Sequence, residues 1–289
     1  MKNKASSSIF RSLALGFVQG LTEFLPLSSS FHLHLCSKLF GFREVKLKES
    51  CLLHGASLLA VLIVLWQELK DLAIDAFQTC FNLLSEGIPA WNEVLRSPSA
   101  KIILISLPCL LTGYFLRDFI KRCNQNYLLN IILFIFFGIL LPLGFIWNTN
   151  TKSISEINFS GMFLLGCVQV IALIRGVSRL GIVLTFCGFL NLAFDEAFKF
   201  SIILSVPIIL ASFGYELYKS LKDTFTEQKS LIFHREDLLG FLFSLVLSYL
   251  TLKLILLFLQ EANLIIFAFY RLILGCWLLI RLYKDKAKV

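Results

Sequence analysis

Two polar side chains interrupt an apolar stretch near the N-terminus of this 289-residue chain. Gln19 and Glu23 are four residues apart, so on a helix they share one face. An ionised carboxylate among apolar residues is costly unless it has a partner, so within a membrane it is a candidate for function. A glutamate at a helix end that reaches the membrane interface is the alternative. We favour a functional role for Glu23 because of the residues that follow it.

The residues after Pro26 have the types that bind phosphate. Pro26 has no backbone N–H and disfavours helical geometry at the preceding residue, so a helix should stop there. Ser28, Ser29 and Ser30 then stand where a new helix would begin, where serines cap backbone N–H groups and can also bind phosphate oxygens. His32 follows within one turn and is a candidate nucleophile or general acid/base. On its own a serine triplet is usually only a cap, and a lone histidine is usually structural.

A second polar group interrupts another apolar stretch 150 residues later. Gly176 allows unusual backbone geometry, and Ser178 can cap a following helix. Arg179 offers a planar fork of donors that matches phosphate oxygens. An arginine in an apolar segment usually faces a polar cavity, with an ion pair to Glu23 or a lipid headgroup as the alternative. If the two groups meet, they combine helix N-termini, an arginine, serines, a histidine and a carboxylate, which suits an anionic phosphorus centre.

The composition places both groups in a membrane protein. Hydrophobic residues make up 57% of the chain and charged residues 16%, with a mean hydropathy of +0.79. A soluble domain carries about 25% charged residues, so the bilayer must solvate much of this chain. The net charge of +8 comes from basic residues at the ends of apolar runs, so we expect no nucleic-acid partner. The eight cysteines form no C-x-x-C pair, so we expect neither a disulfide framework nor a zinc site.

Apolar segments of two kinds run along the chain. A membrane-crossing helix needs roughly 20 largely apolar residues. Six segments meet or approach this length: residues 50–67, 99–116, 127–147, 198–217, 238–259 and 262–280. Two further segments, 9–40 and 161–192, are broken by the polar groups described above. Each is predicted to form two short helices joined near membrane depth, which is a re-entrant hairpin.

The two broken segments resemble each other. A shift of 150 positions pairs Gly16 with Gly166, Val18 with Val168, Gln19 with Gln169, and Ser28 with Ser178. Interrupted apolar segments at corresponding places in two halves point to a binding site in inverted-repeat membrane proteins. We therefore predict one all-α polytopic domain over residues 1–289, with six transmembrane helices and two re-entrant hairpins. Its inverted repeats would span about residues 9–147 and about 160–282.

The distribution of basic residues sets the predicted orientation. With the C-terminus in the cytoplasm, most basic residues that flank the spans lie on the cytoplasmic side. The opposite side holds only Lys70, Arg96, Lys101, Lys152 and Lys199. This orientation puts the first hairpin on the cytoplasmic side and the second on the outer side, as inverted repeats require. Residues 1–27 are not expected to be a signal peptide, because their apolar stretch is short and contains Glu23.

The polar motifs resemble those of the bacterial undecaprenyl-diphosphate phosphatase family, also called bacitracin-resistance proteins. The first motif matches the family's (E/Q)-x-x-x-E helix followed by P-x-S-S-(S/T)-x-H, through Gln19, Glu23, Pro26, Ser28, Ser29, Ser30 and His32. The second, P-G-x-S-R-S-x-x-T, is matched in part through Gly176, Ser178 and Arg179. Residues 198–207 resemble the pattern F-S-x-x-L-x-x-P, and residues 267–271 resemble a C-terminal family pattern. The resemblance covers nearly the whole chain, and the first motif is specific.

This resemblance implies that the protein hydrolyses undecaprenyl diphosphate to undecaprenyl phosphate and inorganic phosphate, which recycles the lipid carrier for peptidoglycan synthesis. It also implies a multi-pass protein of the bacterial plasma membrane, with an active site open to the outer side and assisted by Mg²⁺ or Ca²⁺. A homodimer is left open.

The resemblance and the residue types together assign a role to each matching position. We expect Arg179, Ser178 and Gly176 to hold the diphosphate, together with Ser28 and Ser30 of the serine loop. His32, or alternatively Ser29, would attack the phosphorus or activate water. Glu23, with Gln19, would hold the cation or shuttle protons.

Four positions depart from the family pattern. Phe31 replaces a glycine beside His32, and Arg175 replaces a proline and adds a second positive charge. Leu180 and Val183 replace the serine and threonine of the second motif. These changes affect the expected details of phosphate coordination.

Two other functions fit part of the pattern. Inverted repeats with broken helices also describe transporters and lipid flippases for anionic substrates, but a transporter needs no nucleophile. A membrane-anchored structural partner, in which the polar residues serve helix packing, is the other alternative. It predicts that no single hairpin substitution abolishes phosphate release.

Overall fold

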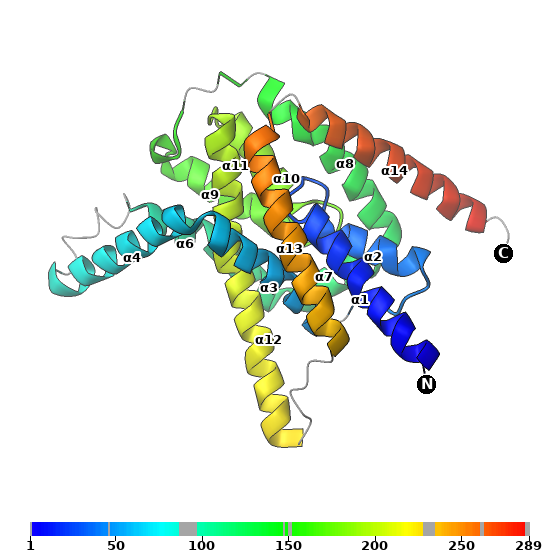
Figure 1. Cartoon of the computed structure of the whole chain (residues 1–289). Coiled ribbons are helices and arrows are strands. Elements are labelled where there is room, and N and C mark those ends of the chain that lie inside the picture. Colours follow the sequence, from blue (N-terminus) through cyan, green and yellow to red (C-terminus); the bar gives the residue numbers. More distant parts are fainter. Residues whose placement is uncertain are drawn as a thin grey trace. The chain divides into compact units, whose positions relative to one another are not determined.

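The computed structural model describes residues 2–45, 47–86, 97–146, 148–149, 152–227, 235–260 and 263–286. Three positions named above, the span ends Trp147 and Ala262 and the basic residue Arg96, lie outside these ranges. The regular elements within these ranges are helices (Figure 1). The chain folds into two compact units, residues 1–64 with 206–259, and residues 65–205 with 260–289.

The predicted spans coincide with the long apolar helices. Within the described ranges, five helical segments are long and apolar enough to cross a membrane: Pro98–Phe115, Tyr127–Ile146, Phe194–Tyr215, Arg235–Phe258 and Leu264–Asp285. A sixth is reached if Lys48–Val64 and Trp66–Ser85 count as one broken span. These segments confirm an all-α, multi-pass membrane protein.

The first unit is built around two helices in close contact. It contains α1 (Lys2–Thr22), α2 (Ser29–Leu39), α3 (Leu47–Val64), most of α12 (Ser205–Glu227) and α13 (Arg235–Phe258). Figure 1 shows α1 in blue alongside α13 in orange. A Cβ at Gly16 would lie 2.5 Å from the carbonyl oxygen of Gly240, and one at Gly20 would lie 2.9 Å from that of Ser244. Small residues four apart thus let the two backbones meet, as in other membrane helix pairs.

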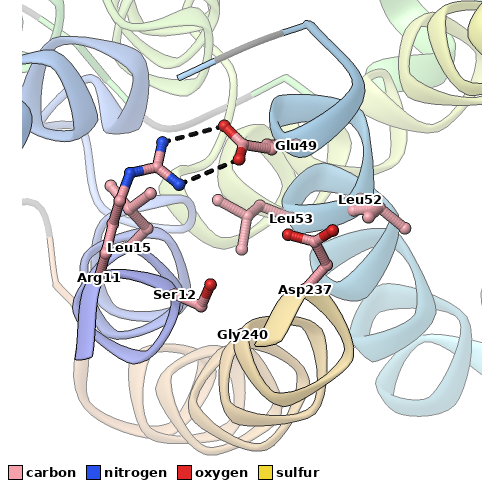
Figure 2. Close-up of a pocket in the computed structure, with 8 residues that line it drawn as sticks. All are labelled: Arg11, Ser12, Leu15, Glu49, Leu52, Leu53, Asp237 and Gly240. Atoms are coloured by element: carbon pink, nitrogen blue, oxygen red, sulfur yellow. Dashed lines mark hydrogen bonds and ion pairs between the residues drawn. The ribbon is translucent and has the colours of Figure 1, made fainter. Parts of the chain in front are cut away.

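An ion-pair cluster joins the middle of α1 to the start of α3 in the first unit. The buried Arg11 guanidinium donates to both carboxylate oxygens of Glu49, at 3.0 Å each, and Arg43 also pairs with Glu49. Figure 2 shows this pair at the edge of a small pocket that Asp237 and Gly240 also line. The cavity is about 20 Å³, which is room for a single water molecule. It is therefore too small to be the site of a lipid diphosphate.

The second unit contains the other helices that the structure describes. These are α4 (Trp66–Glu86), α6 (Pro98–Phe115), α7 (Arg117–Gln125), α8 (Tyr127–Ile146), α9 (Phe159–Ile171), α10 (Arg179–Phe189), α11 (Phe194–Ile203) and α14 (Leu264–Lys286), with a 3₁₀ turn at Ile154–Glu156. The serine at position 97 caps α6 by accepting a hydrogen bond from Ala100 N, with Pro98 at the first helical position. Helix α10 packs on α8, α9 and α11 and so lies at the centre of this unit.

Two helices were not anticipated from the sequence. Helix α7 is short and strongly charged, and α4 carries charged residues among its apolar ones, so neither gives a long apolar run. In α4, Phe77, Phe81 and Leu84 are exposed at helical spacing, which is typical of a helix that lies against a membrane surface. Helix α14 also continues to Lys286, six residues beyond the predicted span end, because its basic last turns remain helical.

Both segments predicted to be broken are helix pairs with a non-helical tip. Helix α1 ends at Thr22 and α2 begins at Ser29, while α9 ends at Ile171 and α10 begins at Arg179. The backbone takes positive φ at Ser28 (67°) and Ser178 (73°), and again at Gly41 (65°) and Asn191 (63°). Both pairs are 150 residues apart, and positive φ is uncommon outside glycine. This agreement supports the predicted repeat, which stays a prediction.

Candidate active site

The carboxylate of Glu23 is the centre of the polar cluster at the first hairpin tip. It is buried just beyond the last residue of α1. Across the Pro26 break, the Ser29 hydroxyl donates a hydrogen bond to Glu23 Oε2, and the Gln19 amide nitrogen donates to the same oxygen at 3.0 Å. Hydrogen bonds to the charged form stabilise it in a buried place. The predicted pairing of Gln19 with Glu23 on one helix face is therefore present.

Three residues join this cluster that the sequence analysis did not assign to the site. His54 Nδ1 lies 3.4 Å from Glu23 Oε1 and 3.0 Å from the Gln19 amide nitrogen. Ser57 lies 3.4 Å from the same nitrogen, and its hydroxyl is 3.0 Å from that of Ser248. His54 and Ser57 come from α3 and Ser248 from α13. The only signal in the sequence was that His54 and Ser57, three residues apart, share a face of an apolar helix.

The hydrogen bond of His32 fixes which ring nitrogen can react. Nδ1 of this buried side chain lies 3.0 Å from the carbonyl oxygen of Ser28. A carbonyl oxygen only accepts, so Nδ1 carries the proton and Nε2 carries the lone pair of the neutral ring. The ring of Phe31, a departure from the family pattern, packs edge-on at 6.0 Å between centroids. His32 is thus held in one orientation that suits a nucleophile or a base.

The serine loop differs in one respect from the expectation. Ser28 occupies the cap position of α2, but its side chain makes no capping hydrogen bond, so the expected cap is wrong at this residue. Its hydroxyl lies 3.5 Å from that of Ser30 instead, and Ser29 points to Glu23. The positive φ of Ser28 explains this, because a cap residue normally takes an extended backbone from which its side chain reaches the first turn.

The second hairpin tip presents its motif at the start of α10. Ser178 accepts a hydrogen bond from Gly181 N at 3.2 Å, so the predicted cap is present here. Gly176 has φ +97°, and a Cβ there would lie 2.3 Å from the Asn130 carbonyl oxygen, so a larger residue does not fit. Arg179 is the first residue of α10 and is partly buried. The helix start and the guanidinium are therefore together, as an anion site requires.

The departures in the second motif have structural roles. The Arg175 side chain donates to the carbonyl oxygen of Asn124 at 3.2 Å, and its backbone N–H donates to the Asn124 side chain at 2.7 Å. Leu180 and Val183 are buried in the unit. The positions that carry hydroxyls in the family pattern thus contribute apolar packing in this chain.

The predicted site residues form two sets, one in each unit. Gln19, Glu23, Ser28, Ser29, Ser30 and His32 gather at the first tip, and Gly176, Ser178 and Arg179 at the second. That both tips face one substrate stays a prediction.

Comparison with known proteins gives the family. A family model described as "Bacitracin resistance protein BacA" matches residues 12–277. The undecaprenyl-diphosphatase of Caldicellulosiruptor bescii is 31% identical over 93% of this chain and 96% of its own length. Those of Alcanivorax borkumensis and Saccharophagus degradans are 33% and 31% identical, each over 93% of this chain and 97% of its own. The resemblance seen in the sequence motifs is confirmed, and the chain belongs to the bacitracin resistance protein BacA family.

Proposed function

We propose that this chain hydrolyses undecaprenyl diphosphate to undecaprenyl phosphate and inorganic phosphate. Its family and the names of its relatives support this activity. The observation in the chain that carries it is the hydrogen bond from the Ser29 hydroxyl to the buried Glu23 carboxylate, in the same tip as His32. A carboxylate in contact with a hydroxyl, beside an oriented imidazole, is the arrangement that nucleophilic or acid–base chemistry requires. A transporter would need only the anion-binding part.

Two groups of the first tip can attack the terminal phosphorus. His32 is our first assignment, because its Nε2 lone pair needs no deprotonation. A phosphorus–nitrogen bond would form while the bond to the bridging oxygen breaks, undecaprenyl phosphate would leave, and water would then release phosphate. Alternatively, His32 takes a proton from the attacking water. Ser29 is the other candidate nucleophile, with Glu23 accepting its proton.

The second tip would bind the diphosphate. Arg179 supplies paired donors for phosphate oxygens, and the N-terminus of α10 adds the favourable end of the helix dipole. Gly176 and Ser178 set the backbone there, and Ser28 and Ser30 would contribute hydroxyls from the first tip. Membership of the family supports a bacterial plasma-membrane location with the site open to the outer side. The excess of basic residues on one side of the predicted topology supports only the orientation with the C-terminus in the cytoplasm.

A divalent cation, Mg²⁺ or Ca²⁺, fits the donors present as part of this proposal. The described residues contain no group of three or more His, Cys, Asp or Glu that could hold a metal. Mg²⁺ is commonly bound by one or two carboxylates together with substrate phosphates and water, and Glu23 can supply such a carboxylate. Bound there, the cation would neutralise charge on the diphosphate.

Phosphate release by purified protein in detergent, without any gradient, tests the proposed activity. His32→Ala and Arg179→Ala should each lose nearly all turnover, whereas His34→Ala, two residues away on α2, should not. Near-normal turnover by both variants would refute the site assignment. Acid-quenched and alkali-quenched reactions separate the nucleophiles, because a phosphohistidine is acid-labile whereas a phosphoserine is acid-stable.

A further inference from the structure

The side chain of Arg271 is fully buried in the middle of α14. A buried guanidinium stays charged in most settings and needs hydrogen-bond partners. Its Nε donates to the carbonyl oxygen of Phe134 at 2.9 Å, and its guanidinium lies over the Phe134 ring, 4.8 Å from the centroid. Its Nη2 donates to the carbonyl oxygens of Gly176 and Val177, the latter at 3.3 Å. Arg271 therefore joins α14 and α8 to the second hairpin tip.

The neighbouring helix leaves room for this side chain. A Cβ at Gly138, on α8, would lie 2.8 Å from Cβ of Arg271 and 3.3 Å from its Nε. Any larger residue at position 138 would push the arginine away. The glycine thus permits the guanidinium to reach the tip.

The two carbonyls that Arg271 holds determine where the adjacent N–H groups point. In a planar trans peptide the C=O and N–H lie on opposite sides. The described residues contain no cis peptide bond. With the carbonyls of Gly176 and Val177 turned toward Arg271, the N–H groups of Val177 and Ser178 face the opposite side. The Val177 N–H donates there to the carbonyl oxygen of Ile174 at 3.4 Å, so the Ser178 N–H is the donor that the substrate could use. The Ser178 N–H immediately precedes the N–H groups of the first turn of α10.

From this geometry we infer that Arg271 is a positioning residue for the phosphatase. It orients the backbone from Gly176 to Ser178 so that the Ser178 N–H joins Arg179 in binding the diphosphate. The inference rests on the proposed function, because it assumes that the second tip binds the substrate. Asn124 holds the same tip from another side by donating to the carbonyl oxygen of Leu173 at 3.2 Å. Asn124 makes no described contact with the peptide of Val177 and Ser178, whereas Arg271 holds its carbonyl oxygen.

A purely structural role for Arg271 makes a different prediction. It would lower the yield or thermal stability of the protein, but the folded fraction would keep its KM and kcat. A positioning role changes the binding of the diphosphate itself. It should therefore raise KM, and it should weaken inhibition by inorganic diphosphate in parallel.

The inference is tested by measuring KM, kcat and inhibition by inorganic diphosphate for Arg271→Met and Arg271→Lys, with kcat expressed per molecule of folded enzyme. Loss of one preorganised donor costs on the order of 10²-fold in rate, so we expect about that loss in kcat/KM for Arg271→Met. Arg271→Lys keeps the charge but not the fork, so it should recover part of this loss. The matched controls are Arg281→Met and Arg281→Lys, since Arg281 is exposed on the same helix and lies over Trp277.

Each outcome decides the question. Unchanged KM, kcat and diphosphate inhibition in folded Arg271→Met would overturn the inference while leaving the proposed function intact. If Arg271→Met does not fold, Arg271→Lys decides, with about a tenfold loss in kcat/KM expected and parental constants contradicting it. Absence of phosphate release by the unmodified protein would overturn the proposed function and this inference together.

Discussion

The Ser29 hydroxyl donates a hydrogen bond to the Glu23 carboxylate across the break that Pro26 makes between α1 and α2. A hydrogen bond between side chains thus links the end of α1 to the start of α2. Gln19 holds the carboxylate from the other side at 3.0 Å. The first hairpin is therefore organised around one buried acidic group.

Replacing this carboxylate by an amide tests its chemical role. We expect Glu23→Gln to lower kcat by 10²-fold or more, since general acid–base groups contribute about 10²–10⁴-fold. The shape is kept, so the variant should remain folded in detergent. Glu44→Gln, an exposed position beyond α2, is the matched control and should keep the parental rate. A Glu23→Gln enzyme with parental kcat would show that the carboxylate serves only packing.

His54 should support Glu23 without being essential. Its Nδ1 lies 3.4 Å from Glu23, but Gln19 and Ser29 keep their own hydrogen bonds to the carboxylate. We expect His54→Ala to reduce kcat by about tenfold, at the low end of the range for such groups. A loss as large as that of Glu23→Gln would instead make His54 a catalytic residue, and steady-state phosphate release distinguishes the two.

Features that arise within one segment were predictable from the sequence, whereas features that arise between distant segments were not. The helix breaks, the shared face of Gln19 and Glu23 and the cap at Ser178 follow from local spacing and residue type. Packing or a polar contact with a hairpin was the expectation for His54, but Glu23 could not be named as its partner, because hydrophobic periodicity does not say which helices pack together. Arg271 was placed only in a C-terminal family pattern, because its hydrogen bonds to the carbonyl oxygens of Phe134, Gly176 and Val177 depend on backbone groups that leave no mark in the sequence.

The positive φ at Ser28 was also beyond local prediction. A serine at a helix start normally takes an extended backbone and caps the helix. Here the left-handed backbone at Ser28 turns its side chain toward Ser30, so the Ser28 hydroxyl lies next to the Ser30 hydroxyl and does not cap the helix. Only the surrounding hairpin can impose this conformation, since it is unfavourable for a residue with a Cβ.

Gly176 should be the least replaceable residue of the second tip. A Cβ at this position is disfavoured by φ +97°, at roughly 1–2 kcal/mol. It would also lie 2.3 Å from the Asn130 carbonyl oxygen. We expect Gly176→Ala to lose most activity and to lower the melting temperature in detergent. Gly214→Ala on α12 is the control, since nothing lies within 4 Å of its Cβ, and alanine favours a helix by about 1 kcal/mol. Equal behaviour of the two variants would contradict the close approach at Gly176.

The ion pair between Arg11 and Glu49 should contribute to stability but not to catalysis. Both side chains are nearly buried, with 10% and 12% exposed, and the pair is bidentate. Glu49→Gln would leave the Arg11 charge buried with weaker acceptors, and breaking such a pair costs roughly 3 kcal/mol. The melting temperature in detergent should therefore fall, while KM and kcat of the folded enzyme stay at parental values. Glu68→Gln is the matched control, because its pair with Lys199 is exposed and exposed pairs contribute about 0–1 kcal/mol. A kinetic defect in folded Glu49→Gln would mean that this cluster is coupled to the hairpin site, and equal melting temperatures for the two variants would mean that the Arg11 pair is no stronger than a surface contact.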